Sequence, residues 1–251
     1  MARRPLVAGN WKMHGSRAEN AALLDALLHG QEAYATADVL VCPPSVYLWE
    51  AARLLKATNI ALGAQSVCAE SIGAFTGEIS ASMLKDVGCQ YAIVGHSERR
   101  AIYKEDDALV ARKFVAAQAQ ELTPILCVGE SLEERESQKT FAVVARQLQA
   151  VLDVISNDAL SKSVIAYEPV WAIGTGKNAT AEQAQEVHAF IRGELHKRDA
   201  TIAAGVRILY GGSVKAANAA EIFAMTDVDG GLVGGASLKA DEFLKICAAA
   251  T

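Results

Sequence analysis

Several features that would assign the chain to a common class of protein are missing from its 251 residues. The five cysteines form no C-x-x-C pair, which argues against a zinc site or a thioredoxin-like motif. No apolar run approaches the roughly 18 residues of a membrane span, so no membrane partner is expected. The apolar stretch near the N-terminus ends at Lys12, too early for a signal peptide. The cysteine usage and the missing leader predict a cytoplasmic protein, with Cys42 and Cys127 reduced and buried in its core.

The chain also has no excess of positive charge. It carries 24 Lys and Arg against 29 Asp and Glu, a net charge of −5. A general nucleic-acid binder needs a basic patch or stripe, so no nucleic-acid partner is expected. Charged residues make up 21% of the chain and hydrophobic residues 51%, which is typical of a folded protein and excludes a disordered one.

What the chain does contain is a repeated pattern of short apolar runs and amphipathic stretches. The runs are residues 5–10, 39–42, 60–64, 91–95, 125–129, 164–168, 206–211 and 231–234. Their hydrophobicity is continuous, which is typical of parallel strands covered on both faces. The stretches between them have helical periodicity: Val115 belongs to one predicted apolar face and Phe141 to another. Residues 180–183 match a capping box, which predicts that a helix begins there.

Eight strand–helix units in about 250 residues have the size of an α/β (β/α)₈ barrel, in which helices ring eight parallel strands. A doubly wound parallel sheet is the alternative α/β architecture. No linker, low-complexity tract or block of charge divides the chain. We therefore expect a single barrel domain over residues 1–251.

Polar side chains follow several of the apolar runs directly, among them Asn10, Lys12, His96 and Glu168. In a barrel the carboxyl ends of all the strands lie on one rim, which is where the active sites of such barrels are found. Lys12 could be a solvated lysine, an anion-binding group or a Schiff-base lysine. His96 would stand at the start of a helix, whose positive end disfavours imidazolium and favours a neutral ring. Glu168 is either a strand-end carboxylate that reaches solvent or a general base.

Glycines follow the last two runs as Gly211-Gly212-Ser213 and Gly234-Gly235. After strands 7 and 8 of a barrel they would mark a phosphate site, because glycine lets backbone N–H groups approach a ligand closely. Residues 169–177 are apolar and bounded by Pro and Gly, which predicts a lid over a ligand. They do not form a Walker A loop, since Trp171 stands where that motif requires Gly.

Segments of the chain resemble the triosephosphate isomerase family along essentially its whole length. They are residues 9–13 (GNWKM), 63–65 (GAQ), 73–78 (GAFTGE), 94–100 (VGHSERR), 127–130 (CVGE), 166–177 (AYEPVWAIGTGK), 210–214 (YGGSV) and 232–238 (LVGGASL). The resemblance implies a cofactor-independent and metal-free isomerase of glycolysis and gluconeogenesis. Its reaction would interconvert dihydroxyacetone phosphate and D-glyceraldehyde 3-phosphate through an enediolate.

The resemblance also implies a role for each site residue. Glu168 would be the base and neutral His96 the group that polarises the carbonyl, a pairing for which this family is itself the standard worked case. Lys12 would stabilise negative charge, supported by Asn10, and Glu98 would organise the site. The phosphate would be bound by Asn10, Lys12, Gly174, Ser213, Gly234 and Gly235.

The segment 65–78 is long for a loop between a strand and a helix. By resemblance it is the loop of a homodimer, with Thr76 touching the partner subunit. Three residues at this expected interface depart from the family pattern: His14, Ser66 and Cys68. They bring the strength of the dimer and its sensitivity to thiol reagents into question.

Two other functions fit parts of this pattern. A phosphate-binding barrel aldolase would use Lys12 as a Schiff base, provided that an apolar or cationic setting favours the neutral amine. A barrel that serves only as a binding or structural protein could tolerate loss of the base or the lid. Lys12, His96, Glu168 and the predicted lid are all present, which favours the isomerase.

Overall fold

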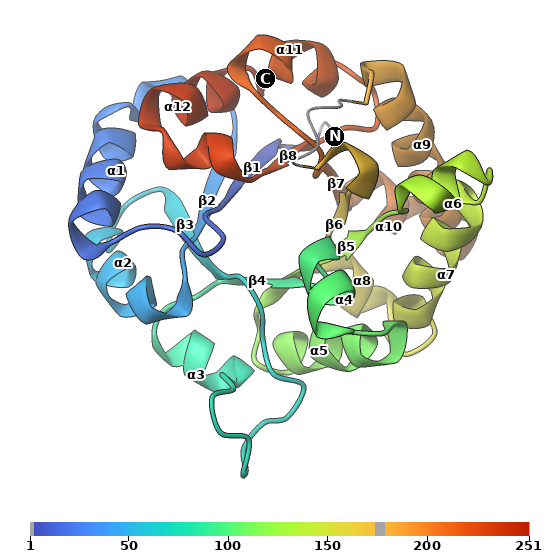
Figure 1. Ribbon diagram of the computed structural model, residues 1–251, viewed down its shortest axis with the longest axis horizontal. Helices are drawn as coiled ribbons and strands as arrows, with labels where there is room; N and C mark the ends of the chain where they lie inside the picture. Colours follow the sequence, from blue (N-terminus) through green and yellow to red (C-terminus); the bar gives the residue numbers. More distant parts are fainter. Residues whose placement is uncertain (1–2, 174–178, 251) are drawn as a thin grey trace.

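A closed barrel of eight parallel strands, paired in sequence order, forms the centre of the molecule (Figure 1). The computed structural model describes residues 3–173 and 179–250. The strands are β1 (Leu6–Asn10), β2 (Asp38–Cys42), β3 (Ile60–Ala64), β4 (Tyr91–Val94), β5 (Thr123–Val128), β6 (Val164–Tyr167), β7 (Arg207–Tyr210) and β8 (Gly230–Val233). β8 pairs with β1 and closes the barrel. The predicted (β/α)₈ barrel is therefore confirmed, and the doubly wound sheet is wrong.

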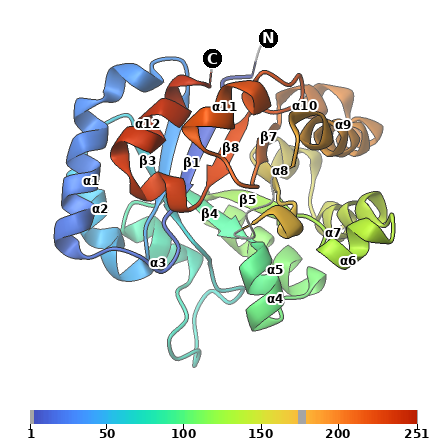
Figure 2. The same ribbon diagram turned by 45° about the horizontal axis from the view of Figure 1, so that its top comes forward.

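Helices surround the barrel on all sides, as the tilted view in Figure 2 also shows. The α-helices are α1 (Arg17–His29), α2 (Leu48–Leu54), α3 (Ala81–Asp86), α4 (Ser97–Tyr103), α5 (Asp107–Ala119), α6 (Leu132–Glu136), α7 (Thr140–Leu152), α8 (Asn157–Ser161), α9 (Ala181–Arg198), α10 (Ala200–Gly205), α11 (Ala216–Phe223) and α12 (Ala240–Ala248). Short 3₁₀ turns are η1 (Gln31–Tyr34), η2 (Ser45–Tyr47), η3 (Val170–Ala172) and η4 (Gly235–Leu238). Among these helices, none is long and apolar enough to cross a membrane.

Side chains alternate between the two faces of the sheet along each strand, and this alternation divides the core into two parts. Leu6 and Ala8 of β1 belong to an inner cluster that fills the barrel, whereas Val7 between them packs outward against the helices. Successive strand residues point to opposite faces, so both faces of these strands are buried and the runs are apolar throughout. Cys42 and Cys127 lie in the inner cluster, which confirms their predicted burial.

Helix boundaries follow from local capping, and helix faces from tertiary packing. Thr180 and Gln183 make both bonds of the predicted capping box at the start of α9. The prediction that Val115 and Phe141 face the core is wrong, because Val115 is 43% exposed and Phe141 is 39% exposed. Val115 follows the buried Phe114 and is rotated by about 100° around the helix axis, which places it at the edge of the apolar face. Phe141 contacts the ring of Phe190 at the surface instead.

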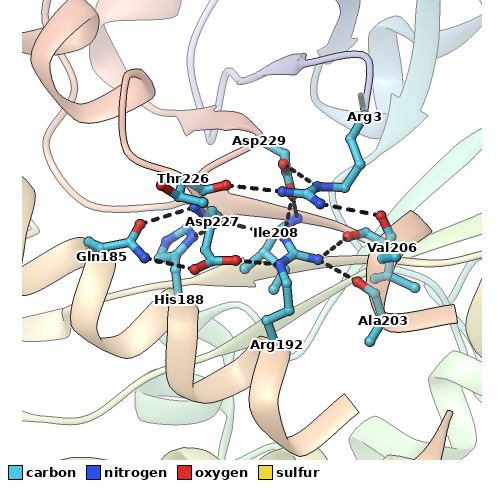
Figure 3. A network of polar contacts seen from close by, with 11 residues as sticks. Arg3, Gln185, His188, Arg192, Ala203, Val206, Ile208, Thr226, Asp227 and Asp229 are labelled. Atoms are coloured by element: carbon cyan, nitrogen blue, oxygen red, sulfur yellow. Dashed lines mark hydrogen bonds and ion pairs between the residues drawn. The ribbon is translucent and has the colours of Figure 1, made fainter. Parts of the chain in front are cut away.

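A partly buried network of charged groups ties the N-terminal segment to α9 and to the last two strands (Figure 3). Arg192 of α9 forms ion pairs with Asp227 and Asp229, both at 2.7 Å. Asp229 also pairs with Arg3 at 2.6 Å, and its other oxygen accepts a hydrogen bond from the Ile208 amide at 2.8 Å. Because every charge has a partner of opposite sign, the network fastens the strands that close the barrel without leaving an isolated buried ion.

His188 of α9 lies beside this network and is fully buried. Its Nδ1 lies 3.1 Å from the Asp227 carbonyl oxygen, so this nitrogen carries the hydrogen of the neutral ring and donates it. The ring centroid lies 5.9 Å from that of Tyr167 and 6.4 Å from that of Tyr210. Burial lowers the pKa of His188 from 6.5 to about 4. Between about pH 4 and pH 6.5 the folded protein therefore keeps this imidazole neutral, whereas the unfolded chain would protonate it.

We expect this buried imidazole to make the fold sensitive to acid. A pKa that is lower in the folded state means that the unfolded state gains a proton first, so stability is lost as the pH falls below 6.5 toward 4. Between pH 7 and pH 5 the contribution is about 2 kcal/mol. Urea unfolding at both pH values should show this loss in the wild type and in the surface control His29→Gln, and a smaller loss in His188→Gln. Equal losses in all three proteins would contradict the prediction.

Candidate active site

The carboxylate of Glu168 lies immediately after β6 and is only 2% exposed. Its two oxygens accept hydrogen bonds from the Ser97 amide at 2.9 Å and from the Ser97 hydroxyl at 3.1 Å. The Nε2 atom of His96 lies 3.0 Å from one of the same oxygens. Donors from the start of α4 therefore compensate the burial of this charge, and they bring Glu168 into contact with His96.

His96 connects β4 to α4 and caps that helix with its ring. Its Nδ1 accepts a hydrogen bond from the Glu98 amide at 3.3 Å. An accepting Nδ1 carries no hydrogen, so the neutral ring has its hydrogen on Nε2, directed at Glu168. His96 is thus the N-cap of α4, and its ring is held in place by the first turn of that helix.

Lys12 follows β1 with a strained backbone, since its φ is +51°. Two side-chain amides hold this conformation: Asn10 accepts a hydrogen bond from the Lys12 N–H at 3.0 Å, and Gln65 donates one to the Lys12 carbonyl at 2.8 Å. Non-glycine residues rarely adopt a left-handed conformation unless their surroundings impose it. The ammonium group of Lys12 forms an ion pair with Glu98, which is partly exposed.

A cavity of about 290 Å³ opens at the carboxyl ends of the strands. Its lining includes seven of the predicted site residues: Asn10, Lys12, His96, Glu168, Ser213, Gly234 and Gly235. Lys215, at the start of α11, adds a second cation to this lining. Gly174, the remaining predicted phosphate ligand, lies outside the described residues. Residues from five different strand ends thus meet at one small site with local positive charge.

Glycine is required where β7 ends beside the carboxylate. A Cβ atom on Gly211 would lie 2.8 Å from Cγ of Glu168, which is closer than real Cβ contacts. The predicted role of this glycine pair was contact with phosphate. What the structure shows is that Gly211 leaves room for the Glu168 side chain.

Sequence reasoning missed the contribution of Ser97. Its position within the GHSER segment was visible, but only the fold places its hydroxyl and amide against Glu168. The role of Glu130 was missed as well. This fully buried residue accepts hydrogen bonds from Tyr167 and Trp171, at 3.1 and 3.0 Å, and pairs with Arg135. Polarity at a strand end was the only signal in the sequence.

Cys127 lies inside the barrel beneath the site. Burial, and next the neighbouring Glu168 carboxylate, raises the pKa of its thiol well above the usual value. The thiol is therefore protonated at neutral pH, and a thiolate nucleophile is not available there.

The residues expected at a dimer interface lie apart from the cavity lining. Thr76 and His14 are exposed on loops, and the loop that carries Thr76 projects at the bottom of Figure 1. Ser66 accepts a hydrogen bond from the buried Lys113 at 3.3 Å. Cys68 is buried within the chain, so its thiol is shielded from solvent.

Comparison with known proteins agrees with this geometry. A family model described as triosephosphate isomerase matches residues 5–250. The chain belongs to the triosephosphate isomerase family. Relatives named triosephosphate isomerase are 63% identical in Thiobacillus denitrificans and 58% identical in Nitrosococcus oceani, each over 99% of both chains. The crystal structure of triosephosphate isomerase from Bartonella henselae superimposes with a TM-score of 0.89 at 44% identity, over 98% of both chains.

The resemblance that the sequence motifs indicated is thus confirmed over nearly the full length. Members of the triosephosphate isomerase family interconvert dihydroxyacetone phosphate and glyceraldehyde 3-phosphate, a step of glycolysis. The chain is an enzyme of this type, and its substrate is a triose phosphate.

The tight fit of Gly211 beside the carboxylate can be tested by Gly211→Ala. The added methyl group would collide with Glu168 Cγ, so we expect kcat to fall by roughly 10-fold or more, with about 1–3 kcal/mol lost from folding stability. Gly205→Ala is the matched control, because a Cβ there meets no atom within 4 Å. Steady-state kinetics of both variants check the expectation, and unchanged turnover in Gly211→Ala would show that the side chain can move aside.

Proposed function

We propose that Glu168 is the general base of the isomerisation. It removes the proton from one substrate carbon and returns it to the adjacent carbon, by way of an enediolate. His96, with its hydrogen on Nε2, polarises the carbonyl and moves protons between the two substrate oxygens. The 3.0 Å approach of Nε2 to the Glu168 carboxylate, inside a cavity that also contains Lys12, carries this proposal.

Lys12 stabilises the negative charge of the enediolate and of the phosphate, and Asn10 supports it by holding its backbone. A cation about 4 Å from an oxyanion gains roughly 4 kcal/mol at an effective dielectric constant near 20. Glu98 forms an ion pair with Lys12 and orients the ammonium group before substrate binds. The Nζ atom of Lys12 donates to Glu98 and is not free to act as a nucleophile, which argues against a Schiff base.

The phosphate group binds where β7 and β8 end. Ser213, Gly234 and Gly235 present backbone N–H groups to it, and Gly174 adds another from the predicted lid. Lys215 beside them contributes positive charge that the net charge of the chain does not reveal. This location agrees with the usual phosphate site of (β/α)₈ barrels.

Residues 169–177 form a lid that closes over the bound substrate, excludes water and protects the enediolate. Residues 174–177 lie outside the described residues. The described part supports the proposal by its anchoring: the Val170 amide and the Trp171 indole both donate to Glu130. Ile173, the last described residue before this gap, reaches the cavity lining.

The enzyme is a homodimer that assembles through the loop 65–78. Large apolar side chains stand exposed on the segments that follow the first four strands: Met13, Val46, Ile72, Phe75, Met83, Ile102 and Tyr103. Their concentration on one side of the barrel is typical of a protein interface. Thr76 at the tip of the loop then reaches the Asn10 and His96 region of the second subunit.

The chain works as one domain, residues 1–251, in the cytoplasm. Support for one domain comes from the barrel itself, since β8 at the end of the chain pairs with β1 at its beginning. Support for the cytoplasm comes from the five cysteines, which are all free thiols.

The role of the base is tested by Glu168→Gln, which keeps the shape of the side chain and removes its basicity. We expect kcat to fall at least about 100-fold, while the affinity for a phosphate-bearing substrate analogue stays within a few-fold of wild type. A coupled assay with glyceraldehyde 3-phosphate measures turnover, and calorimetry measures analogue binding. Turnover near the wild-type level would remove Glu168 from this role.

The interface is tested by Ile72→Glu, since Ile72 is 87% exposed on the loop. A charge there would be buried against the partner subunit, so we expect monomers in analytical ultracentrifugation and a large loss of specific activity at low protein concentration. Leu54→Glu places the same charge on the exposed end of α2 as a control and should remain dimeric. A dimeric and fully active Ile72→Glu protein would place the interface elsewhere.

A further inference from the structure

Gln147 is a buried polar residue of α7 that lies outside the cavity lining. Only 6% of it is exposed, and its neighbour Leu148 belongs to the apolar face that α7 packs on the barrel. Both ends of its side-chain amide bind one residue. Its Oε1 accepts a hydrogen bond from the Gly129 N–H at 2.8 Å, and its Nε2 donates one to the Gly129 carbonyl at 3.1 Å. The side chain thus pairs with Gly129 as the backbone of a neighbouring strand would.

Gly129 stands directly against the backbone of Glu168. A Cβ atom on Gly129 would lie 1.8 Å from the Glu168 carbonyl oxygen and 3.2 Å from its Cα, so no other residue fits there. One residue earlier, the Val128 carbonyl accepts a hydrogen bond from the Glu168 N–H at 2.8 Å. The end of β5 therefore forms the surface on which the backbone of Glu168 rests.

The regular ladder between β5 and β6 ends at the pair Val128 and Tyr167, just before these two residues. Beyond that point β6 does not supply partners for the N–H and carbonyl groups of Gly129, and Gln147 supplies both. An unpartnered backbone group is free to turn toward water or another donor, which would move Gly129 relative to Glu168.

We propose that Gln147 is a positioning residue for the base of this enzyme. It fixes Gly129, and Gly129 fixes the backbone from which the Glu168 carboxylate extends. The inference rests on the proposed role of Glu168 as the base. Gln147 does not line the cavity, so its effect is on the placement of the base and not on contacts with the phosphate.

The experiment combines two substitutions at Gln147 with the Glu168→Gln background in a double-mutant cycle. Gln147→Leu removes both hydrogen bonds to Gly129, and Gln147→Glu keeps the volume and the acceptor but loses the donor. We expect Gln147→Leu to lower kcat at least about 5-fold and to leave KM within about twofold, with a smaller loss for Gln147→Glu. In the Glu168→Gln background neither change should lower kcat further by more than about twofold, because the positioned group is no longer a base.

Gln149→Leu is the matched control, since it makes the same change two residues along α7 at an exposed position and should leave kcat unaltered. Circular dichroism and ultracentrifugation establish that each variant is folded and dimeric. If Gln147→Leu does not fold, the cycle is read from Gln147→Glu alone. A kcat within twofold of wild type, a loss confined to KM, or an equal loss in the Glu168→Gln background would overturn the inference. If Glu168→Gln itself retains wild-type turnover, the assignment of the base fails instead.

Discussion

Closure of the barrel by β8 pairing with β1 is the constraint on which the rest of the molecule depends. Pairing in sequence order with every strand parallel places all eight carboxyl ends on one rim. Asn10, His96 and Glu168 are up to 158 residues apart in the chain, yet each reaches the rim by the same geometry. The ion pairs of Arg192, Asp227 and Asp229 fasten the strands that complete this closure.

The site itself depends on a buried carboxylate whose charge is compensated locally. Ser97 supplies two donors and His96 a third, all from the beginning of α4. Backbone contacts with Gly129 and side-chain contact with Gly211 limit where Glu168 can go. Residues that follow β4, β5 and β7 thus determine the position of the Glu168 carboxylate. Such contacts between strand ends make the rim of the barrel rigid although it consists of loops.

The cavity is lined by cationic side chains although the net charge of the protein is negative. The chain carries a charge of −5, but Lys12 and Lys215 both line the cavity. An anionic substrate responds to this local potential more strongly than to the total charge. The exposed apolar side chains of the first four strand–helix units follow other strands of the barrel, so the proposed dimer surface would adjoin the cavity.

The order of the elements, the fold class and most of the cavity lining were accessible from sequence, since buried parallel strands need continuous apolar runs and the polar residues stood directly after them. The family motifs added the proposed roles of His96 and Glu168. Local rules could not reveal that Val115 and Phe141 are exposed, because the edge of a helix face depends on what packs against it. Nor could they reveal that Ser97 and Gly129 contact Glu168, or that Gln147 pairs with Gly129. Those contacts join segments distant in sequence, and only the tertiary structure decides which buried polar groups find one another.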